Sequence, residues 1–232
     1  MEQLAAATTN VPSPLGHGLA IFDLDRTLIG GSSLVPFGHE LVRRGLVDRR
    51  TVARHLVAAA VFQRRGLGDR GVERVQARLL SVLCGHKLEP LEAAAADVGS
   101  ALAELAFRSA RWLLDQHLSR GDFCVVLTAA PQQLAEAVAH RLGAHRAIGT
   151  RLAVADAHLT GEIDGVVCHG PGKLVRLREE VGDVDWSHAA AYGDSASDVP
   201  VLERCRTPVA VNPDRRLRQI ASERGWPMIT FD

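Results

Sequence analysis

This sequence has no long apolar run, no paired cysteines and no block of basic residues, and each absence excludes a class of protein. No apolar stretch approaches the ~20 residues that a membrane-spanning helix needs. The four cysteines lie far apart without a Cys-x-x-Cys pair, which predicts reduced thiols and argues against a zinc site. The formal net charge is zero, so we expect no nucleic-acid partner and no membrane association.

The beginning of the chain also lacks the features of a secretion signal. Residues 1–17 have neither the basic start nor the apolar centre of a signal peptide, and we interpret them as a flexible N-terminal lead-in. The whole chain has 232 residues, 47% of them hydrophobic, enough for one substantial core and a smaller second domain. Together these features predict a cytoplasmic enzyme.

Two carboxylates follow the first apolar run of the chain. Leu19–Phe22 predicts a buried strand, and Asp23 and Asp25 come directly after it, one residue apart. Alternation along an extended backbone would point both side chains to the same side. Two like charges held that close need a cation or a proton to relieve them. For this pair alone, an Asp-rich turn after a strand is the alternative interpretation.

Two further predicted strands also end in polar residues. Phe123–Leu127 ends at Thr128, just before a predicted helix start, and Ala189–Tyr192 runs into Asp194 and Asp198. In open α/β sheets, chemistry gathers where the strands end at their carboxyl edge. The sequence therefore predicts that these side chains approach the first pair of carboxylates.

Lysine is rare in this chain, and one lysine lies in a helix just before the third of these strands. Only two of the 27 basic residues are lysines, so Lys173 is not explained by background composition. Each polar residue nevertheless has an ordinary alternative when taken singly. Lys173 could be a solvated helix residue, and Thr128 a strand-end hydroxyl or an N-cap. Asp194, Ser195 or Ser197 could cap the following helix.

In their order along the chain, these four pieces resemble the four motifs of the haloacid dehalogenase (HAD) superfamily of phosphoryl-transfer enzymes. Asp23–Thr27 resembles the first motif, Thr128 the second, Lys173 the third and Gly193–Asp198 the fourth. The resemblance covers the chain from about residue 18 to its end and is to subfamily IB, the phosphoserine-phosphatase-like branch. It implies an α/β fold: a doubly wound, Rossmann-like parallel-sheet core with an inserted α-helical cap domain.

The resemblance also implies roles for individual residues. Asp23 would be the nucleophile that forms an aspartyl-phosphate, and Asp25 the general acid that later acts as base. Thr128 and Ala129 would bind phosphate oxygens, and Lys173 would add positive charge to both the phosphate and the nucleophile.

The implied cofactor is Mg²⁺. Its ligands would be Asp23, the backbone carbonyl of Asp25 and Asp194, with Asp198 near or in the coordination sphere, because this hard cation takes oxygen ligands.

Two positions bear on the substrate. In phosphoserine phosphatases an acidic residue nine positions after the nucleophile binds the substrate amine, and here that position is Ser32. A hydroxyl cannot neutralise an ammonium, which argues against phosphoserine as the substrate. Arg26, bulky and charged between two motif residues, is a second candidate for substrate contact, and cap arginines such as Arg74 and Arg78 are further candidates.

The periodicity of the chain predicts where the cap is inserted. From about residue 34 to residue 118, strand signals vanish and helical spacing prevails. We predict a cap over residues 34–118, whose last helix returns the chain to a core of residues 18–33 and 119–232. The predicted helices are Val35–Arg44, Arg50–Arg64, Asp69–Leu83, Pro90–Ala106 and Arg108–Leu118. Further core strands are expected at Ala147–Ile148 and Pro208–Val211, with a β-hairpin of Arg151–Ala155 and His158–Glu162.

These features predict a Mg²⁺-dependent phosphatase that hydrolyses a small phosphorylated metabolite, as a monomer or homodimer. A lid that excludes water also excludes large partners, which favours a small substrate. Three alternatives stay open: phosphoserine phosphatase proper, a phosphotransferase that passes the phosphoryl group to an alcohol, and a non-catalytic metabolite-binding module. The paired nucleophile and acid argue against the last of these.

Overall fold

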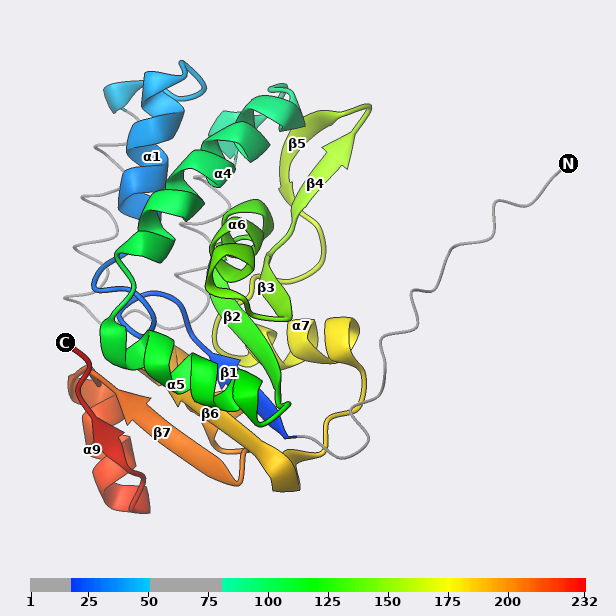
Figure 1. The fold of residues 1–232 in the computed structure, drawn as a ribbon. Coiled ribbons are helices and arrows are strands. Elements are labelled where there is room, and N and C mark those ends of the chain that lie inside the picture. The colour runs from blue at the N-terminus through cyan, green and yellow to red at the C-terminus, as the bar shows by residue number, and fades with distance from the viewer. Residues whose placement is uncertain (1–17, 51–80) are drawn as a thin grey trace, which may run out of the picture.

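The computed structural model describes residues 18–50 and 81–232, and its central feature is a parallel β-sheet (Figure 1). The sheet has six strands in the order β3-β2-β1-β6-β7-β8, and every neighbouring pair is parallel. The predicted doubly wound α/β core is therefore confirmed. The strands are β1 (Leu19–Phe22), β2 (Phe123–Pro131), β3 (Arg146–Thr150), β6 (Ala189–Gly193), β7 (Thr207–Val211) and β8 (Met228–Ile229).

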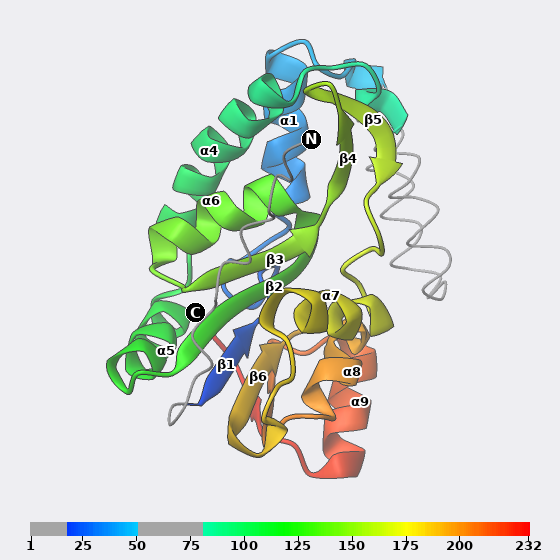
Figure 2. The same cartoon turned by 90° about the vertical axis from the view of Figure 1, so that its right-hand side faces the viewer.

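Helices cover both faces of this sheet (Figure 2). Ala20 and Phe22 of β1 belong to the core on one face, whereas Leu19 and Ile21 belong to the core on the other. Because both faces are buried, the strand is apolar at every position. The first face is covered by α5 (Arg108–Ser119) and α6 (Gln132–Leu142), and the second by α7 (Pro171–Val181), α8 (Val199–Leu202) and α9 (Arg215–Arg224).

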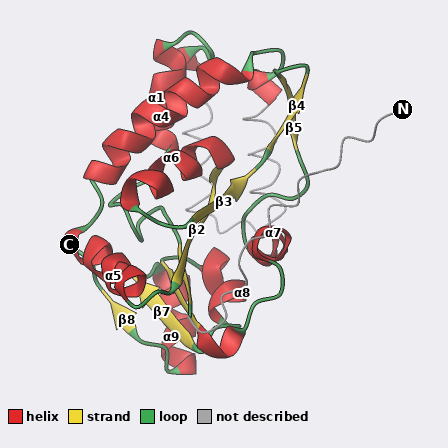
Figure 3. Ribbon diagram, turned by 45° about the vertical axis from the view of Figure 1, so that its right-hand side comes forward, coloured by secondary structure: helices red, strands yellow, loops and turns green. Residues whose placement is uncertain are grey.

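A second group of elements lies beyond the α6 side of the sheet (Figures 1 and 3). It comprises α1 (Leu34–Arg43), the 3₁₀ turn η1 (Ser81–Leu83), α4 (Leu88–Glu104) and the hairpin strands β4 (Leu152–Ala155) and β5 (His158–Ile163). Three predicted elements, the first and fourth helices and the hairpin, are confirmed within two residues at their ends. The predicted helices Arg50–Arg64 and Asp69–Leu83 lie almost wholly outside the described residues, as do Arg74, Arg78 and residues 1–17.

Helix α4 connects this group to the core by packing along α6. A Cβ atom added at Gly99 would overlap the Cβ of Ala137 and lie 3.1 Å from the backbone nitrogen of Val138. The two helices can therefore come this close only because position 99 is glycine.

The hairpin is bonded to the chain segment that leads into α4. The N–H of Gly85 donates to the carbonyl of Leu159 at 2.8 Å, and the N–H of Leu159 donates to the carbonyl of His86 at 2.8 Å. The N–H of Leu88 donates to Ala157 at 2.9 Å. Although it follows the core strand β3 in sequence, the hairpin thus packs with the helices of the second group.

The structure corrects two local predictions. The strand predicted to end at Thr128 continues as β2 to Pro131, and α6 begins only at Gln132. A shift in pairing between β2 and β3 after Leu127 accompanies this extension. Strand β8 was not predicted, because two residues paired to β7 at the sheet edge carry no periodic signal.

Two sequence predictions about composition can also be compared with the structure. All four cysteines are free, as expected for reduced thiols, and three of them are buried. No helix among residues 18–50 and 81–232 is long and apolar enough to cross a membrane.

Candidate active site

The register of the sheet brings the predicted motifs to one edge. Phe22 at the end of β1 pairs with Val126 of β2 on one side and with Tyr192 of β6 on the other. The next residue, Asp23, donates its N–H to the carbonyl of Tyr192 at 2.9 Å. Because parallel strands end in the same direction, Asp194 after β6 lies at the same edge as Asp23.

Lys173, in the first turn of α7, reaches into this edge. Only 2% of the residue is exposed, so the alternative of a solvated helix lysine is wrong. Its Nζ donates to Oδ1 of Asp23 at 2.7 Å and to Oδ1 of Asp198 at 2.5 Å. Burial alone would lower the pKa of Lys173, but the carboxylates of Asp198 and Asp23 raise it above its ordinary value. The ammonium therefore stays charged at neutral pH.

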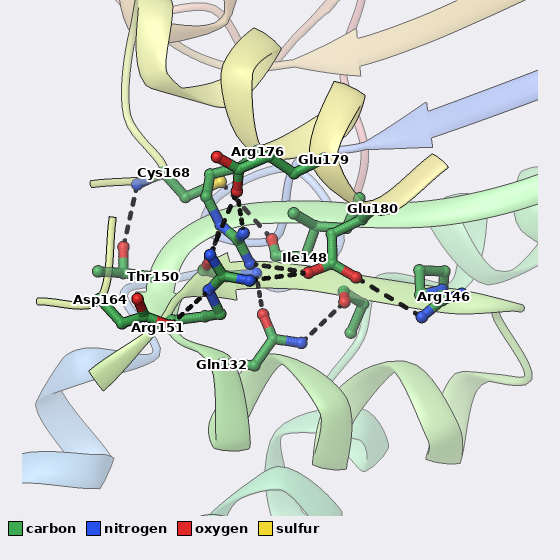
Figure 4. Close-up of polar contacts among 12 residues, drawn as sticks. Gln132, Arg146, Ile148, Thr150, Arg151, Asp164, Cys168, Arg176, Glu179 and Glu180 are labelled. Atoms are coloured by element: carbon green, nitrogen blue, oxygen red, sulfur yellow. Dashed lines mark hydrogen bonds and ion pairs between the residues drawn. The ribbon is translucent and has the colours of Figure 1, made fainter. Parts of the chain in front are cut away.

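Helix α7 is fixed in place by a cluster of ion pairs (Figure 4). The fully buried Arg176 contacts Glu179 at 2.5 Å and Glu180 at 3.1 Å, and its Nε donates to the carbonyl of Gly149 on β3 at 3.3 Å. Arg151, at the base of the hairpin, contacts Glu179 at 3.4 Å. The bond to Gly149 and the contact of Arg151 with Glu179 thus join α7, the helix that carries Lys173, to β3 and to the hairpin.

Asp198 is placed by a short turn after β6. Ser195 is the N-cap of the 3₁₀ turn Ala196–Asp198, and its N–H donates to Oδ2 of Asp198 at 3.1 Å. The capping alternative therefore holds for Ser195 but is wrong for Asp194. A Cβ atom at Gly193 would lie 2.5 Å from the Cβ of Asp198, so only glycine permits this approach. Gly193 is the first residue of the segment that resembles the fourth motif.

Asp23, Asp194 and Asp198 form a compact group of buried carboxylates. Each can offer an oxygen such that all three atoms lie within 4.8 Å of one another. Burial, with repulsion from Asp198, raises the pKa of Asp23 to about 7 although Lys173 lowers it in part. Burial, with repulsion from Asp23 and Asp198, raises the pKa of Asp194 to about 8. An oxygen-only donor set carrying this much negative charge fits a hard divalent cation such as Mg²⁺.

The carboxylate of Asp25 is not one of these three, although its charge contributes to the raised pKa of Asp23. Its Oδ1 accepts the backbone N–H of Ser33 at 2.8 Å, and its Oδ2 accepts the Ser32 hydroxyl at 3.4 Å. Burial raises the pKa of Asp25 above its ordinary value, although these bonds from Ser33 and Ser32 lower it in part. A carboxyl group with a raised pKa, held in a loop, can carry a proton to a leaving group. The predicted specificity residue Ser32 thus contacts the predicted general acid.

Arg26 contacts the carboxylate group rather than solvent alone. Its Nε lies 2.6 Å from Oδ2 of Asp194. Its backbone has φ of 61°, a left-handed conformation that is uncommon for arginine. The side-chain amide of Asn212, which follows β7, donates to the carbonyl of Arg26 at 3.1 Å. No role for Asn212 was predicted from the sequence, although its position directly after a predicted core strand was a usable signal.

The predicted phosphate-binding residues lie at the end of β2. Thr128 is 2% exposed, and its hydroxyl oxygen accepts the N–H of Ala130 at 3.2 Å. The carbonyl of Ala129 accepts the hydroxyl of Thr150 at 2.9 Å. Because Pro131 precedes α6, the alternative that Thr128 caps this helix is wrong.

Comparison with known proteins agrees with this arrangement. Residues 20–203 match the family model of the haloacid dehalogenase-like hydrolases. The phosphoserine phosphatase SerB1 of Mycobacterium tuberculosis is 35% identical, over 98% of this chain and 76% of its own length. The histidinol-phosphatase of Neisseria meningitidis is 31% identical, over 92% of this chain and 98% of its own.

A solved structure shows the same fold over most of the molecule. A protein of unknown function from Bordetella pertussis superposes with a TM-score of 0.78 at 29% identity, over 92% of this chain and 98% of its own. Together with the parallel sheet and the carboxylate group at its edge, these likenesses show that the chain belongs to the haloacid dehalogenase-like hydrolases and is a phosphatase of their phosphoserine-phosphatase-like branch.

Proposed function

We propose that this phosphatase hydrolyses a small phosphomonoester with Mg²⁺ and through an aspartyl-phosphate on Asp23. The observation that carries the proposal is the pair of contacts from Lys173 to Asp23 and Asp198, beside the carboxylate of Asp194. Mg²⁺ would be held by Asp23, Asp194, Asp198 and the backbone carbonyl of Asp25, and would supply charge neutralisation for an anionic substrate. Phosphoryl transfer depends mainly on such positioning and neutralisation.

In the first step, a carboxylate oxygen of Asp23 attacks phosphorus and the bond from phosphorus to the substrate oxygen breaks. Lys173 keeps the Asp23 carboxylate oriented and adds positive charge beside the phosphate. Asp25 donates its proton to the departing oxygen, so that the product leaves as an alcohol. Thr128 and Ala129, at the end of β2, would bind phosphate oxygens.

In the second step, water attacks the phosphorus of the aspartyl-phosphate. Asp25, now deprotonated, takes a proton from that water, and the bond between phosphorus and the Asp23 oxygen breaks. Inorganic phosphate and free Asp23 result. The hydrogen bonds from Ser33 and Ser32 favour the charged form of Asp25, whereas burial favours the neutral form. This balance suits a group that acts first as a general acid and then as a general base.

The substrate is a small molecule carrying one phosphoryl group. The two named relatives act on phosphoserine and on histidinol phosphate, both small phosphomonoesters. The hydroxyl of Ser32, at the position of the amine-binding acid in phosphoserine phosphatases, supports a substrate other than phosphoserine. The cap, proposed to span residues 34–118, would cover such a substrate during the reaction.

A screen for phosphate release over small phosphomonoesters, in EDTA and in Mg²⁺, tests the proposal. We expect release only with Mg²⁺, and inhibition by Ca²⁺, whose looser coordination sphere would displace the Asp23 carboxylate. Full activity in EDTA would overturn the metal assignment. Added acceptor alcohols would reveal phosphotransfer as a second product.

Rapid acid quench tests the acid and base role of Asp25. With a substrate that has a good leaving group, Asp25→Asn should still become phosphorylated, since little protonation is then needed. Hydrolysis of the phosphoenzyme should slow, so more labelled protein should be trapped than in the unmodified enzyme. Equal labelling with unchanged turnover would remove Asp25 from this role.

A further inference from the structure

Each carboxylate of the proposed metal group is already held by the protein through at least one oxygen. Oδ1 of Asp23 accepts from Lys173. Asp198 accepts from Lys173 through Oδ1 and from the Ser195 N–H through Oδ2. Asp194 is contacted by Arg26 at Oδ2, at 2.6 Å. The side-chain cations of Lys173 and Arg26 thus both contact this group.

The backbone of Arg26 is fixed on both sides in a conformation that arginine rarely adopts. Its φ is 61°. Its N–H donates to the carbonyl of Gly31 at 3.2 Å, and its own carbonyl accepts from Asn212 at 3.1 Å. Left-handed backbone at a non-glycine residue is unfavourable and persists when surrounding contacts impose it. Here the imposed conformation accompanies the contact of the side chain with Asp194.

We propose that Arg26 is a positioning residue for the metal ligand Asp194. The guanidinium forms an ion pair with Oδ2, without a hydrogen bond to that oxygen among the described residues, and would leave Oδ1 for the cation that Asp194 would share with Asp23 and Asp198. The inference rests on the proposed function, which supplies that cation. Groups that contact a metal ligand on the side away from the metal orient that ligand, and their loss typically weakens metal binding 10–100-fold.

The surroundings of the pair favour this role. The side chain of Asp194 is 5% exposed and that of Arg26 46%, so the guanidinium bridges the buried group and the solvent-facing loop after β1. An arginine guanidinium stays charged at every pH used here, so it offsets part of the charge on Asp194 whether or not a cation is bound. In the alternative model, Arg26 competes with the metal: its guanidinium takes the place of the cation beside Asp194 and must move away before Mg²⁺ can bind.

Isothermal titration calorimetry with MgCl₂ separates the two models. We expect Arg26→Asn to bind Mg²⁺ 10–100-fold more weakly than the unmodified protein, and Arg26→Lys to recover part of that loss. Asparagine is chosen because it tolerates positive φ. Arg218→Gln is the matched control: Arg218 is exposed and donates to the carbonyl of Pro213 at 3.3 Å, and it should change the affinity by less than about twofold.

A second measurement uses the unmodified protein and does not depend on any variant folding. The ¹⁵N chemical shift of Arg26 Nε, assigned by its absence in Arg26→Lys, should keep the ion-paired position of the metal-free protein when Mg²⁺ is added. Movement of that signal to the position of a free arginine would overturn the proposal and favour the competitor. Unchanged or tighter Mg²⁺ binding by Arg26→Asn would overturn it as well.

Asp194→Asn distinguishes failure of this inference from failure of the proposed function. Loss of Mg²⁺ binding in Asp194→Asn, with normal binding in Arg26→Asn, would leave the metal site standing and remove Arg26 from it. No Mg²⁺ binding by the unmodified protein, even at millimolar concentration, would overturn both the metal site and the role of Arg26.

Discussion

The carboxyl edge of the sheet and the contact between α4 and α6 are built from opposite kinds of residue. At the edge, three buried carboxylates meet Lys173 and Arg26, and the pKa values of Asp23 and Asp194 are raised first by burial and further by repulsion from the neighbouring carboxylates. At the helix contact, small apolar residues allow two backbones to approach closely around Gly99.

The two regions therefore have different roles, one in binding and chemistry and the other in stability. Crowded carboxylates destabilise the folded protein unless a cation is present, so the edge of the sheet serves binding and chemistry more than stability. The helix contact buries apolar surface and holds the second group of elements on the core. Changes at the edge should therefore alter activity and metal binding, and changes at the helix contact should alter stability.

The largest effect should come from Asp23→Asn. The amide keeps the shape of the side chain but removes the nucleophile and one metal charge, so phosphate release should fall by several orders of magnitude. Circular dichroism should match that of the unmodified protein. Comparable turnover in the variant would remove Asp23 from the nucleophilic role.

Gly99→Ala should produce the opposite result. Alanine is favoured over glycine in a helix by about 1 kcal/mol, which alone would stabilise the protein. Here the added methyl overlaps Ala137, and overpacking of this kind costs about 1–3 kcal/mol, so we expect a net loss of stability. In calorimetry this corresponds to a melting temperature lowered by a few degrees.

The control for this prediction is Mg²⁺ affinity, which should be the same in Gly99→Ala as in the unmodified protein. A raised melting temperature would show that α4 and α6 can separate at no cost. Weakened Mg²⁺ binding would show that the two regions are coupled more closely than their contacts indicate.

Stability should depend on pH through the carboxylate group. The pKa values of Asp23 and Asp194 in the folded protein, about 7 and 8, lie above the unfolded value of 3.8. Between these limits the folded protein binds more protons than the unfolded chain, so its stability falls as pH rises from about 4 to 8. In EDTA, the melting temperature should decrease over this range.

Mg²⁺ should counteract this decrease, because it binds the deprotonated carboxylates. The increase in melting temperature on adding Mg²⁺ should therefore be larger at pH 8 than at pH 6. Asp194→Asn should flatten the pH dependence in EDTA. If the slope in this variant equals that of the unmodified protein, the carboxylate group is not its source.

The smallest effect should come from Arg151→Gln, which breaks the link between the hairpin and α7. Arg151 is 36% exposed and contacts Asp164 at 3.2 Å and Glu179 at 3.4 Å. Ion pairs of this exposure contribute about 0–1 kcal/mol, so the melting temperature should change little. Arg178→Gln, which breaks the exposed pair to Asp183, is the matched control. A fall in kcat for Arg151→Gln alone would show that the hairpin helps to place Lys173.

Much of the core could be predicted from local sequence, because its strands are short, apolar and followed by polar residues. The strand β1 was predicted at its observed ends, and the ordered motifs predicted that Asp23, Lys173, Asp194 and Asp198 would meet. The ends of β2 and the strand β8 could not be predicted, because pairing with a neighbouring strand determines them.

The contacts of Arg26 and Ser32 could also not be predicted from the sequence. Both were candidates for substrate contact, and the structure places the first against Asp194 and the second against Asp25. Side-chain direction after a strand depends on the turn that follows, and here that turn is held by Gly31 and Asn212, the latter 186 residues away from Arg26 in the chain.

The sequence by itself determined the parallel α/β core, the order of the motifs and the residues at the carboxyl edge, because apolar periodicity and strand-end chemistry are local properties of the chain. Only the tertiary structure decided which oxygen each cation binds, which glycines permit close approach and how the hairpin joins the segment before α4. Those features depend on distances between residues far apart in sequence, such as Lys173 and Asp23, which are set by how the strands and helices pack.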